Sequence, residues 1–148
     1  MAEFQEKSTI VRREQLTGDV FRLTVHCPRI AAAAQPGQFV MVRAGETLDP
    51  LLRRPFSIHK VTGDGKLAVL FKVIGKGTRL LAAAMPGERL DVIGPLGSGF
   101  APDPGGPHCL IGGGMGIAPL YFLAQHLLIS GHGAANPPVL LGAQTQAE

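Results

Sequence analysis

The chain has 148 residues, enough for one domain or for one and a half. Its content of 45% hydrophobic and 17% charged residues is typical of a folded protein, and 20 glycines with 12 prolines favour a strand-rich fold over a helix bundle. The formal net charge of +3 is small and the basic residues are scattered, which argues against a nucleic-acid-binding surface and fits a local anion site, such as one for a phosphate, better.

The amino-terminal part has the pattern of two strands joined by a tight turn. Residues 7–16 and 20–27 are rich in Val, Ile, Thr and Phe, and the Thr-Gly-Asp between them favours a turn. In the second segment Phe21, Leu23 and Val25 alternate with polar residues, as expected of a strand with one buried face.

Further strands and one short helix are expected up to residue 100. The extended segments are residues 38–43, 46–61, 66–75 and 88–97, of which the second is broken by Pro50 and Pro55. Residues 62–65 have the character of a hairpin turn. Residues 77–85 are expected as a helix, with Thr78 as its N-cap and Pro86-Gly87 at its end. About six or seven short antiparallel strands predict a closed or nearly closed barrel.

The sequence changes character after residue 100. Residues 98–107 have the composition of a loop, and we place a domain boundary there, between residues 1–100 and 107–148. The second part is expected as a strand, a glycine turn, a helix and another strand, which is one βαβ unit; its regular elements are residues 108–114, 117–130 and 139–143. Because one unit cannot cover a parallel sheet on both faces, we expect the chain to be a piece of a longer protein or to rely on a partner.

The two cysteines are expected to be buried thiols rather than metal ligands. Cys27 and Cys109 lie far apart in the sequence, and each follows a histidine, His26 and His108 respectively. A zinc site would need all four to converge, but neighbours on a strand point to opposite faces, so each pair offers at most one ligand to a given site. We therefore expect no metal site.

The apolar residues 108–130 raise the question of a membrane span. Glycines and Pro119 interrupt the first half of this segment, and His126 lies in the second, so the uninterrupted helical part is about 12 residues, shorter than a span requires. The polar residues 1–9 do not have the pattern of a secretory signal. We expect no membrane span and a reduced, cytoplasmic setting.

Residues 111–116, Ile-Gly-Gly-Gly-Met-Gly, lie between an expected strand and an expected helix. Glycines here would let a ligand approach the backbone and would expose amide groups at the amino end of the helix to an anion. The dinucleotide fingerprint G-x-G-x-x-G does not fit, because its third glycine falls at Ile117, and the Gly-Lys-Ser/Thr of a phosphate-binding loop does not follow. A nucleotide-binding turn and an ordinary tight turn both remain open.

Residues 53–57, Arg-Arg-Pro-Phe-Ser, have two interpretations. They form either an edge strand with a solvated arginine pair, where Pro55 removes one ladder hydrogen bond, or a strand that binds a ligand. In the second case an arginine would hold a pyrophosphate, an aromatic ring would lie against a ring system and a hydroxyl would bond to a ring nitrogen. Residues 75–78, Gly-Lys-Gly-Thr, are likewise either an ordinary capped helix start or a second anion site.

These motifs, in this order, resemble the ferredoxin reductase superfamily: R-P-F-S, then G-K-G-T, then P-L-G, then G-G-G-x-G-I-A-P-L. They look most like the electron-transfer subunit of class 1B dihydroorotate dehydrogenase, although flavin subunits of sulfhydrogenase-type and transhydrogenase-type complexes share the layout. The resemblance implies an antiparallel, Greek-key, FAD-binding β-barrel over residues 1–100. It also implies that residues 107–148 are the first βαβ unit of an incomplete NAD-binding α/β domain.

The resemblance also implies roles for individual residues. Arg54, with Pro55 beside it, would contact the pyrophosphate of FAD, Phe56 would lie against the flavin, and Ser57, the expected catalytic residue, would lie near flavin N5, which accepts hydride. The remaining cofactor-binding residues would be Leu70, Phe71 and Lys72 along the next strand, Gly77 and Thr78 at a phosphate, and Gly112, Gly113, Gly114 and Gly116 in the nicotinamide-nucleotide turn. Arg53 and His59 receive no role.

For the complete subunit, the resemblance implies electron transfer between NAD and a [2Fe–2S] cluster through FAD, during dihydroorotate oxidation in pyrimidine biosynthesis. The partner would be the catalytic dihydroorotate dehydrogenase subunit, which binds FMN, in a hetero-oligomer. In the family a cysteine quartet holds the cluster, but no cysteine follows Cys109 here, so we expect this chain to bind FAD, to hold no cluster and to be inactive alone. The alternatives are a non-catalytic assembly module and a flavin reductase that acts alone on NAD(P)H.

Overall fold

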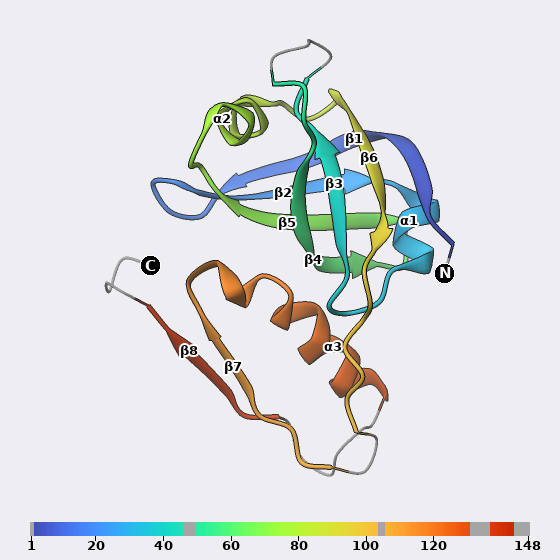
Figure 1. Ribbon diagram of the computed structural model, residues 1–148, viewed down its shortest axis with the longest axis vertical. Coiled ribbons are helices and arrows are strands. Elements are labelled where there is room, and N and C mark those ends of the chain that lie inside the picture. The colour runs from blue at the N-terminus through green and yellow to red at the C-terminus, as the bar shows by residue number, and fades with distance from the viewer. Residues whose placement is uncertain (1, 46–49, 104–105, 131–136, 144–148) are drawn as a thin grey trace.

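The computed structural model describes residues 2–45, 50–103, 106–130 and 137–143. A six-stranded barrel lies above a smaller lobe of two strands and one helix (Figure 1). The barrel strands are β1 (Phe4–Gln15), β2 (Val20–His26), β3 (Phe39–Arg43), β4 (Arg54–Thr62), β5 (Lys66–Lys72) and β6 (Arg89–Leu96), with helices α1 (Pro28–Ala33) and α2 (Lys76–Ala83). The lobe contains β7 (Leu110–Gly113), the 3₁₀ turn η1 (Gly114–Ile117), α3 (Leu120–Ser130) and β8 (Val139–Gly142).

The barrel is closed, with the strand order β1-β2-β5-β4-β3-β6, and all its pairs are antiparallel. β3, β4 and β5 are successive neighbours, and β6 returns beside β3, which makes a Greek key. Closure satisfies the hydrogen-bonding groups that an open sheet would leave at its edges. The predicted antiparallel Greek-key barrel is confirmed.

The core follows from the alternation seen in the sequence. Phe21, Leu23 and Val25 of β2 are all buried and pack in one apolar cluster inside the barrel. Each such side chain contributes about 1.5–3 kcal/mol when it is fully buried. β5 has apolar side chains on both of its faces. On the outer face Leu70 is only 6% exposed, because the second lobe covers it where η1 contacts the strand.

Two helix predictions require correction. α1 was not expected; it begins with Pro28 at its first turn, and Glu6 of β1 accepts a hydrogen bond from the Ile30 N–H over 2.9 Å, which satisfies one free amide at this helix end. α2 begins at Lys76, one residue earlier than predicted, and its N-cap is Gly75. Thr78, predicted as the N-cap, is instead the third residue of the helix.

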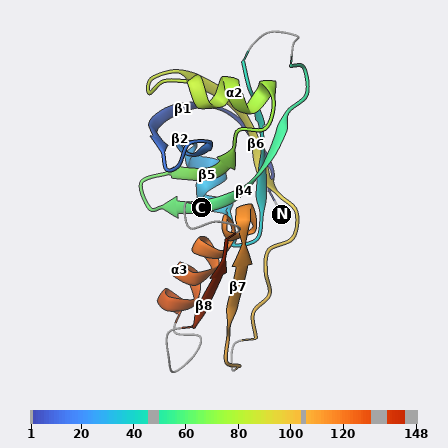
Figure 2. The same cartoon turned by 90° about the vertical axis from the view of Figure 1, so that its left-hand side faces the viewer.

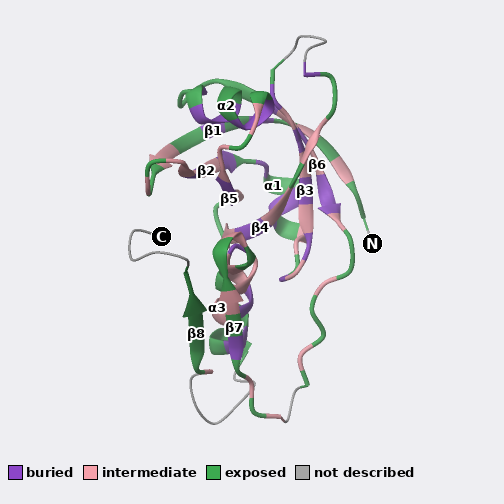
Figure 3. Ribbon diagram, turned by 60° about the vertical axis from the view of Figure 1, so that its left-hand side comes forward, coloured by how far each residue is buried: buried purple, intermediate pink, exposed green. Residues whose placement is uncertain are grey.

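In the second lobe, β7 and β8 pair in parallel, and α3 lies beside them (Figures 1 and 2). The 3₁₀ turn η1 includes Ile117 and a turn over residues 118–119 follows it, so α3 starts at Leu120 rather than at the predicted residue 117. The carboxyl ends of both strands point toward the barrel, where η1 lies under β4 and β5 (Figure 2). β8 is exposed along its whole length (Figure 3).

The cysteines lie in different environments. Cys27 is fully buried, and burial, with the nearby Glu6 carboxylate, raises the pKa of its thiol to about 12. Cys109 is exposed, so the expectation that both thiols are buried is wrong for this residue, which precedes the strand rather than lying inside it. Within the described ranges, no helix has the length and apolar character needed to cross a membrane.

Candidate functional site

The amino end of α2 lies against the first residue of β4. A β-carbon added at Gly77 would lie only 3.1 Å from Nε of Arg54, so the guanidinium group sits directly over this glycine. Within the described part of the chain, Arg54 has no carboxylate partner; its hydrogen bonds go to the backbone carbonyl of Leu52, over 2.8 Å, and to that of Arg53. A guanidinium group and a helix amino end, both positive, therefore lie against each other, which favours the binding of an anion that contacts both.

Thr78 holds the loop that precedes α2. Its hydroxyl accepts hydrogen bonds from the N–H groups of Ile74 and Gly75, both over 3.0 Å, and donates one to the Gly75 carbonyl over 3.0 Å. The backbone N–H groups of Gly77 and Thr78 have no acceptor among the described residues. The Thr78 side chain thus shapes the anion site, while its backbone remains able to bind a ligand.

The next residues of β4 lie in three different environments. Pro55 is exposed, whereas Phe56 is half-buried and packs against the barrel core, with its ring centroid 5.4 Å from that of Phe71. Ser57 is half-buried opposite Phe39 of β3, and in the part of the chain that the structure describes its hydroxyl makes no hydrogen bond. A hydroxyl held on a barrel strand without a partner is available to a ligand.

A cavity of about 300 Å³ separates the barrel from the second lobe, on the side of β5. Of the predicted residues, it brings together Leu70, Lys72 and Gly114; Phe71 points into the core instead, at 2% exposure. Lys72 also pairs with Asp19, with 3.4 Å between Nζ and Oδ2. The lining residues that sequence reasoning missed are Leu16, Thr17, Val20, Met115, Ile117, Leu141, Gly142 and Ala143.

The four predicted glycines of the turn differ in their surroundings. A β-carbon at Gly112 would lie 2.7 Å from the Leu120 side chain, so this glycine allows β7 and α3 to approach each other. Gly114 has a φ of +51°, which disfavours other residues. Gly113 would meet only the Gly142 carbonyl, at 3.6 Å, and Gly116 is open. The turn follows the carboxyl end of a parallel strand, where α/β sheets bind nucleotides.

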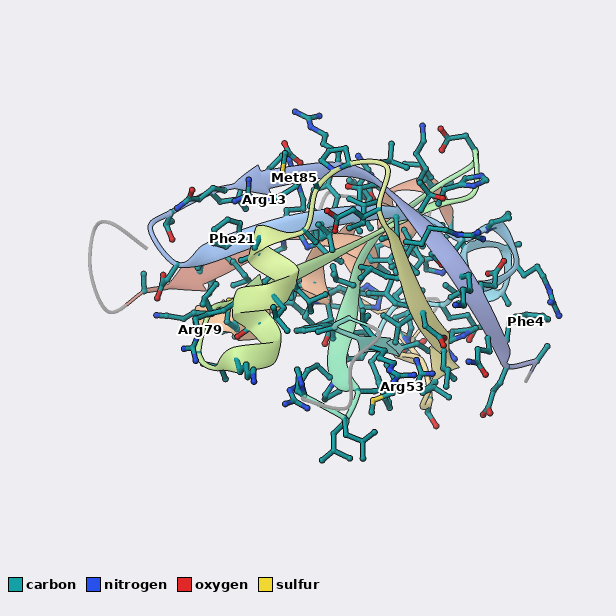
Figure 4. All side chains as sticks on the ribbon, turned by 90° about the horizontal axis from the view of Figure 1, so that it is seen from above. Phe4, Arg13, Phe21, Arg53, Arg79 and Met85 are labelled. Carbon is teal, nitrogen blue, oxygen red and sulfur yellow. The ribbon has the colours of Figure 1, made fainter. Side chains whose placement is uncertain are left out.

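Arg53, which sequence reasoning left without a role, is part of a structural ion pair. Its guanidinium nitrogens lie 3.1 Å from Oδ2 and 3.2 Å from Oδ1 of Asp91 in β6, and Gln5 of β1 donates to both oxygens. Burial raises the pKa of Asp91, but the hydrogen bonds from Arg53 and Gln5 outweigh it, so that the pKa lies below its ordinary value. Figure 4 shows Arg53 beside β6 and well away from Arg79, which projects from α2.

His59, also left without a role, contacts the second lobe. Its Nδ1 lies 2.8 Å from the carbonyl oxygen of Ala118, and its ring stacks on Tyr121 with 5.0 Å between centroids. Burial lowers the pKa of His59, and the nearby cations Arg22 and Lys60 lower it as well, against the effect of the Ala118 hydrogen bond. The imidazole is therefore neutral at neutral pH.

Comparison with known proteins shows which family the chain belongs to. Residues 5–91, more than half of the chain, match the family described as the FAD-binding domain. This chain belongs to that family.

Relatives of this FAD-binding domain include two proteins described as the electron transfer subunit of dihydroorotate dehydrogenase B (NAD(+)). The one from Desulforamulus reducens is 52% identical over 111 residues, which are 74% of this chain and 42% of the relative. The one from Geobacillus thermodenitrificans is 40% identical over 147 residues, 97% of this chain and 56% of the relative. The chain therefore spans about half the length of the curated relatives it matches.

A solved structure, described as NADH-dependent reduced ferredoxin-NADP oxidoreductase, superposes with a TM-score of 0.83 at 33% identity. The match covers 96% of this chain and 50% of that one. A closed barrel followed by a parallel α/β lobe is thus the fold of the ferredoxin reductases, as the sequence motifs indicated.

The residues present fit the cofactor of the FAD-binding domain family. FAD carries a pyrophosphate between its two halves, and Arg54 with the adjoining amino end of α2 provides the positive charge and the free amides that such a group requires. Arg54 can lie this close to α2 because residue 77 is a glycine, since a side chain there would meet the guanidinium group.

Proposed function

We propose that this chain is the FAD-binding part of an electron-transfer subunit of dihydroorotate dehydrogenase. The observation that carries the proposal is the convergence of Arg54 and the amino end of α2 on one anion site, inside a domain of the FAD-binding family. The 52% and 40% identical relatives, both described as electron transfer subunits of that enzyme, support the choice of substrate class.

In this proposal each side chain has a defined task. Arg54 donates to the pyrophosphate together with the N–H groups of Gly77 and Thr78. Ser57 holds its hydroxyl near the ring nitrogen N5, while Leu70 and Lys72 line the wall beside the ring system. A bound flavin takes up two electrons as a hydride and passes them on singly, and the protein's part is to bind it, orient it and exclude water.

For the longer protein we propose NAD as one electron partner, a [2Fe–2S] cluster as the other, and a hetero-oligomer with the catalytic subunit. The glycine turn from Gly112 to Gly116 would form the start of the NAD site, because it lies where the carboxyl ends of β7 and β8 face the barrel. A second candidate is the flavin subunit of a complex that couples ferredoxin to pyridine nucleotides, and the 33% identical solved structure favours it.

Addition of FAD to the purified chain tests the first part of the proposal. Bound FAD should give a yellow protein with the absorbance bands of oxidised flavin, and free FAD fluorescence should change on titration. Because the chain contains no Trp, the flavin signal can be followed without interference from indole fluorescence. A colourless protein that takes up no added FAD would refute the proposal and would favour an assembly module.

Co-purification separates the two candidate complexes. The catalytic dihydroorotate dehydrogenase subunit, expressed with the chain, should be retained with it if the first candidate is right. Retention of a ferredoxin-dependent partner instead, with no binding of the dihydroorotate dehydrogenase subunit, would favour the second.

A further inference from the structure

His59 joins the barrel strand that carries Ser57 to the glycine turn of the second lobe. The carbonyl oxygen of Ala118 can only accept a hydrogen bond, so Nδ1 of His59, 2.8 Å away, carries the proton and donates it. Tyr121 of α3 covers the same imidazole, with 28° between the ring planes. His59 is 8% exposed, so the contact is made out of water, where a hydrogen bond is strong.

The backbone of β4 has an irregularity at His59. The pairing of β4 with β5 matches Ile58 with Val69 and Lys60 with Ala68, so His59 is the extra residue of a β-bulge. Bulges bend a strand and redirect a side chain, and they are common beside functional sites. Ile58 and Val61, on either side of the bulge, both pack in the core, so His59 and Lys60 both face the neighbouring lobe, where each lies against Tyr121.

The contact controls one wall of the cavity between barrel and lobe. Ala118 closes the 3₁₀ turn by donating from its N–H to the Met115 carbonyl over 3.1 Å. Met115 and Ile117, inside that turn, line the cavity opposite Leu70 and Lys72 of β5. A hydrogen bond that holds the Ala118 carbonyl therefore sets the distance between the turn and the barrel.

Other contacts keep the lobe attached when this bond is absent. Phe122 of α3 packs against the barrel core, and Nζ of Lys60 lies 5.7 Å from the Tyr121 ring centroid. Loss of the His59 donor should consequently release the turn without unfolding the barrel or detaching α3.

We propose that His59 is a positioning residue that holds the glycine turn, residues 112–118, at a fixed distance from the flavin-binding strand β4. This role rests on the proposed function, since it concerns the wall of the same FAD site. The alternative is that His59 only fills space between the two lobes.

Four variants separate these roles. His59→Phe keeps a ring against Tyr121 but removes the donor. His59→Asn places an amide N–H where Nδ1 lies, whereas His59→Gln places it farther out, where Nε2 lies, so Asn should restore the bond and Gln should not. His26→Gln, at an exposed histidine at the end of β2, is the matched control.

Hydrogen exchange of the chain without FAD gives the first measurement. In His59→Phe and His59→Gln, peptides covering residues 112–120 should exchange about two- to tenfold faster, while those of β1 and β6 stay unchanged. His59→Asn and His26→Gln should match the unaltered chain. Equal exchange of the turn in all variants, or equal acceleration throughout the barrel, would overturn the proposal. If the Phe variant does not fold, the comparison of Asn with Gln decides.

Iodide quenching of bound FAD gives the second measurement. A released turn should leave the flavin more accessible, so the quenching constant should be higher in His59→Phe and His59→Gln than in His59→Asn. Equal quenching in all three would contradict the role at the cofactor. If the chain binds no FAD, the proposed function fails, but the exchange experiment still tests the hold of His59 on the turn.

Discussion

Replacing Arg54 by alanine should greatly weaken FAD binding and leave the barrel folded. The guanidinium group stands over Gly77 at the amino end of α2, where we propose that it binds the pyrophosphate. Its hydrogen bonds within the chain go to backbone carbonyls near the surface, of which the stronger, to Leu52, is 2.8 Å long and exposed. Their loss should change the free energy of unfolding by less than about 0.5 kcal/mol.

The effect on binding can be estimated from the type of contact. A hydrogen bond to a charged group contributes about 1.5–3 kcal/mol, and each 1.4 kcal/mol is a factor of about ten in affinity. Arg54→Ala should therefore raise the Kd for FAD about 10- to 150-fold. Arg54→Lys keeps the charge but not the planar fork of the guanidinium group, so its Kd for FAD should lie between those of the unaltered chain and Arg54→Ala.

The assay is a titration of FAD fluorescence, combined with thermal unfolding of the same samples. Arg79→Ala is the matched control, because Arg79 lies exposed on the same helix and its side chain has no partner among the described residues. Arg53→Ala should show the reverse pattern, with lower stability and near-normal FAD affinity. Equal loss of FAD binding in the Arg53 and Arg54 variants would refute the assignment.

Three further outcomes are expected. The pKa of Asp91 is lowered in the folded protein, so its contribution to the free energy of unfolding is present above the unfolded pKa of about 3.9 and is lost as the pH falls through the folded pKa. Arg53→Ala should make this pH-dependent loss of stability smaller, as measured by the free energy of unfolding between pH 7 and pH 3. Ser57→Ala should retain FAD but shift its reduction potential, measured by dye equilibration; abolished binding would contradict the role given to Ser57. Gly112→Ala should lower the melting temperature and speed exchange in α3, because its methyl group would meet Leu120 at 2.7 Å; an unchanged melt would argue against this packing.

The barrel could be predicted because short stretches of sequence are enough to indicate its strands and turns. Phe21, Leu23 and Val25 alternate with polar residues, and tight turns with glycine separate the strands, so pattern and turn chemistry agree. α1 was missed because its alanine-rich sequence lacks a side chain that caps its amino end; Glu6, far away in the sequence, supplies the acceptor. A threonine before an apolar run has the pattern of an N-cap, which is why the sequence predicts that role for Thr78, but its hydroxyl bonds backward from inside the helix.

The candidate site was predictable only in part. The motif residues Arg54, Gly77 and Thr78 were recognisable from the sequence, and the structure brings them together. The cavity between the lobes was not recognisable, because residues such as Leu16 and Leu141 meet there through the placement of the second lobe and have no local signal.

The adjacent arginines illustrate why identical residue types in one motif can have separate tasks. Successive side chains of an extended segment point to opposite sides, so Arg53 and Arg54 meet different neighbours. Arg53 reaches across to Asp91 and joins three strands of the barrel through Gln5, whereas Arg54 faces α2. The ion pair with Asp91 neutralises the charge of Arg53 and also holds the backbone that leads into Arg54. Neighbouring residues thus supply a stable barrel and an available guanidinium group, and only the second of them belongs to the anion site.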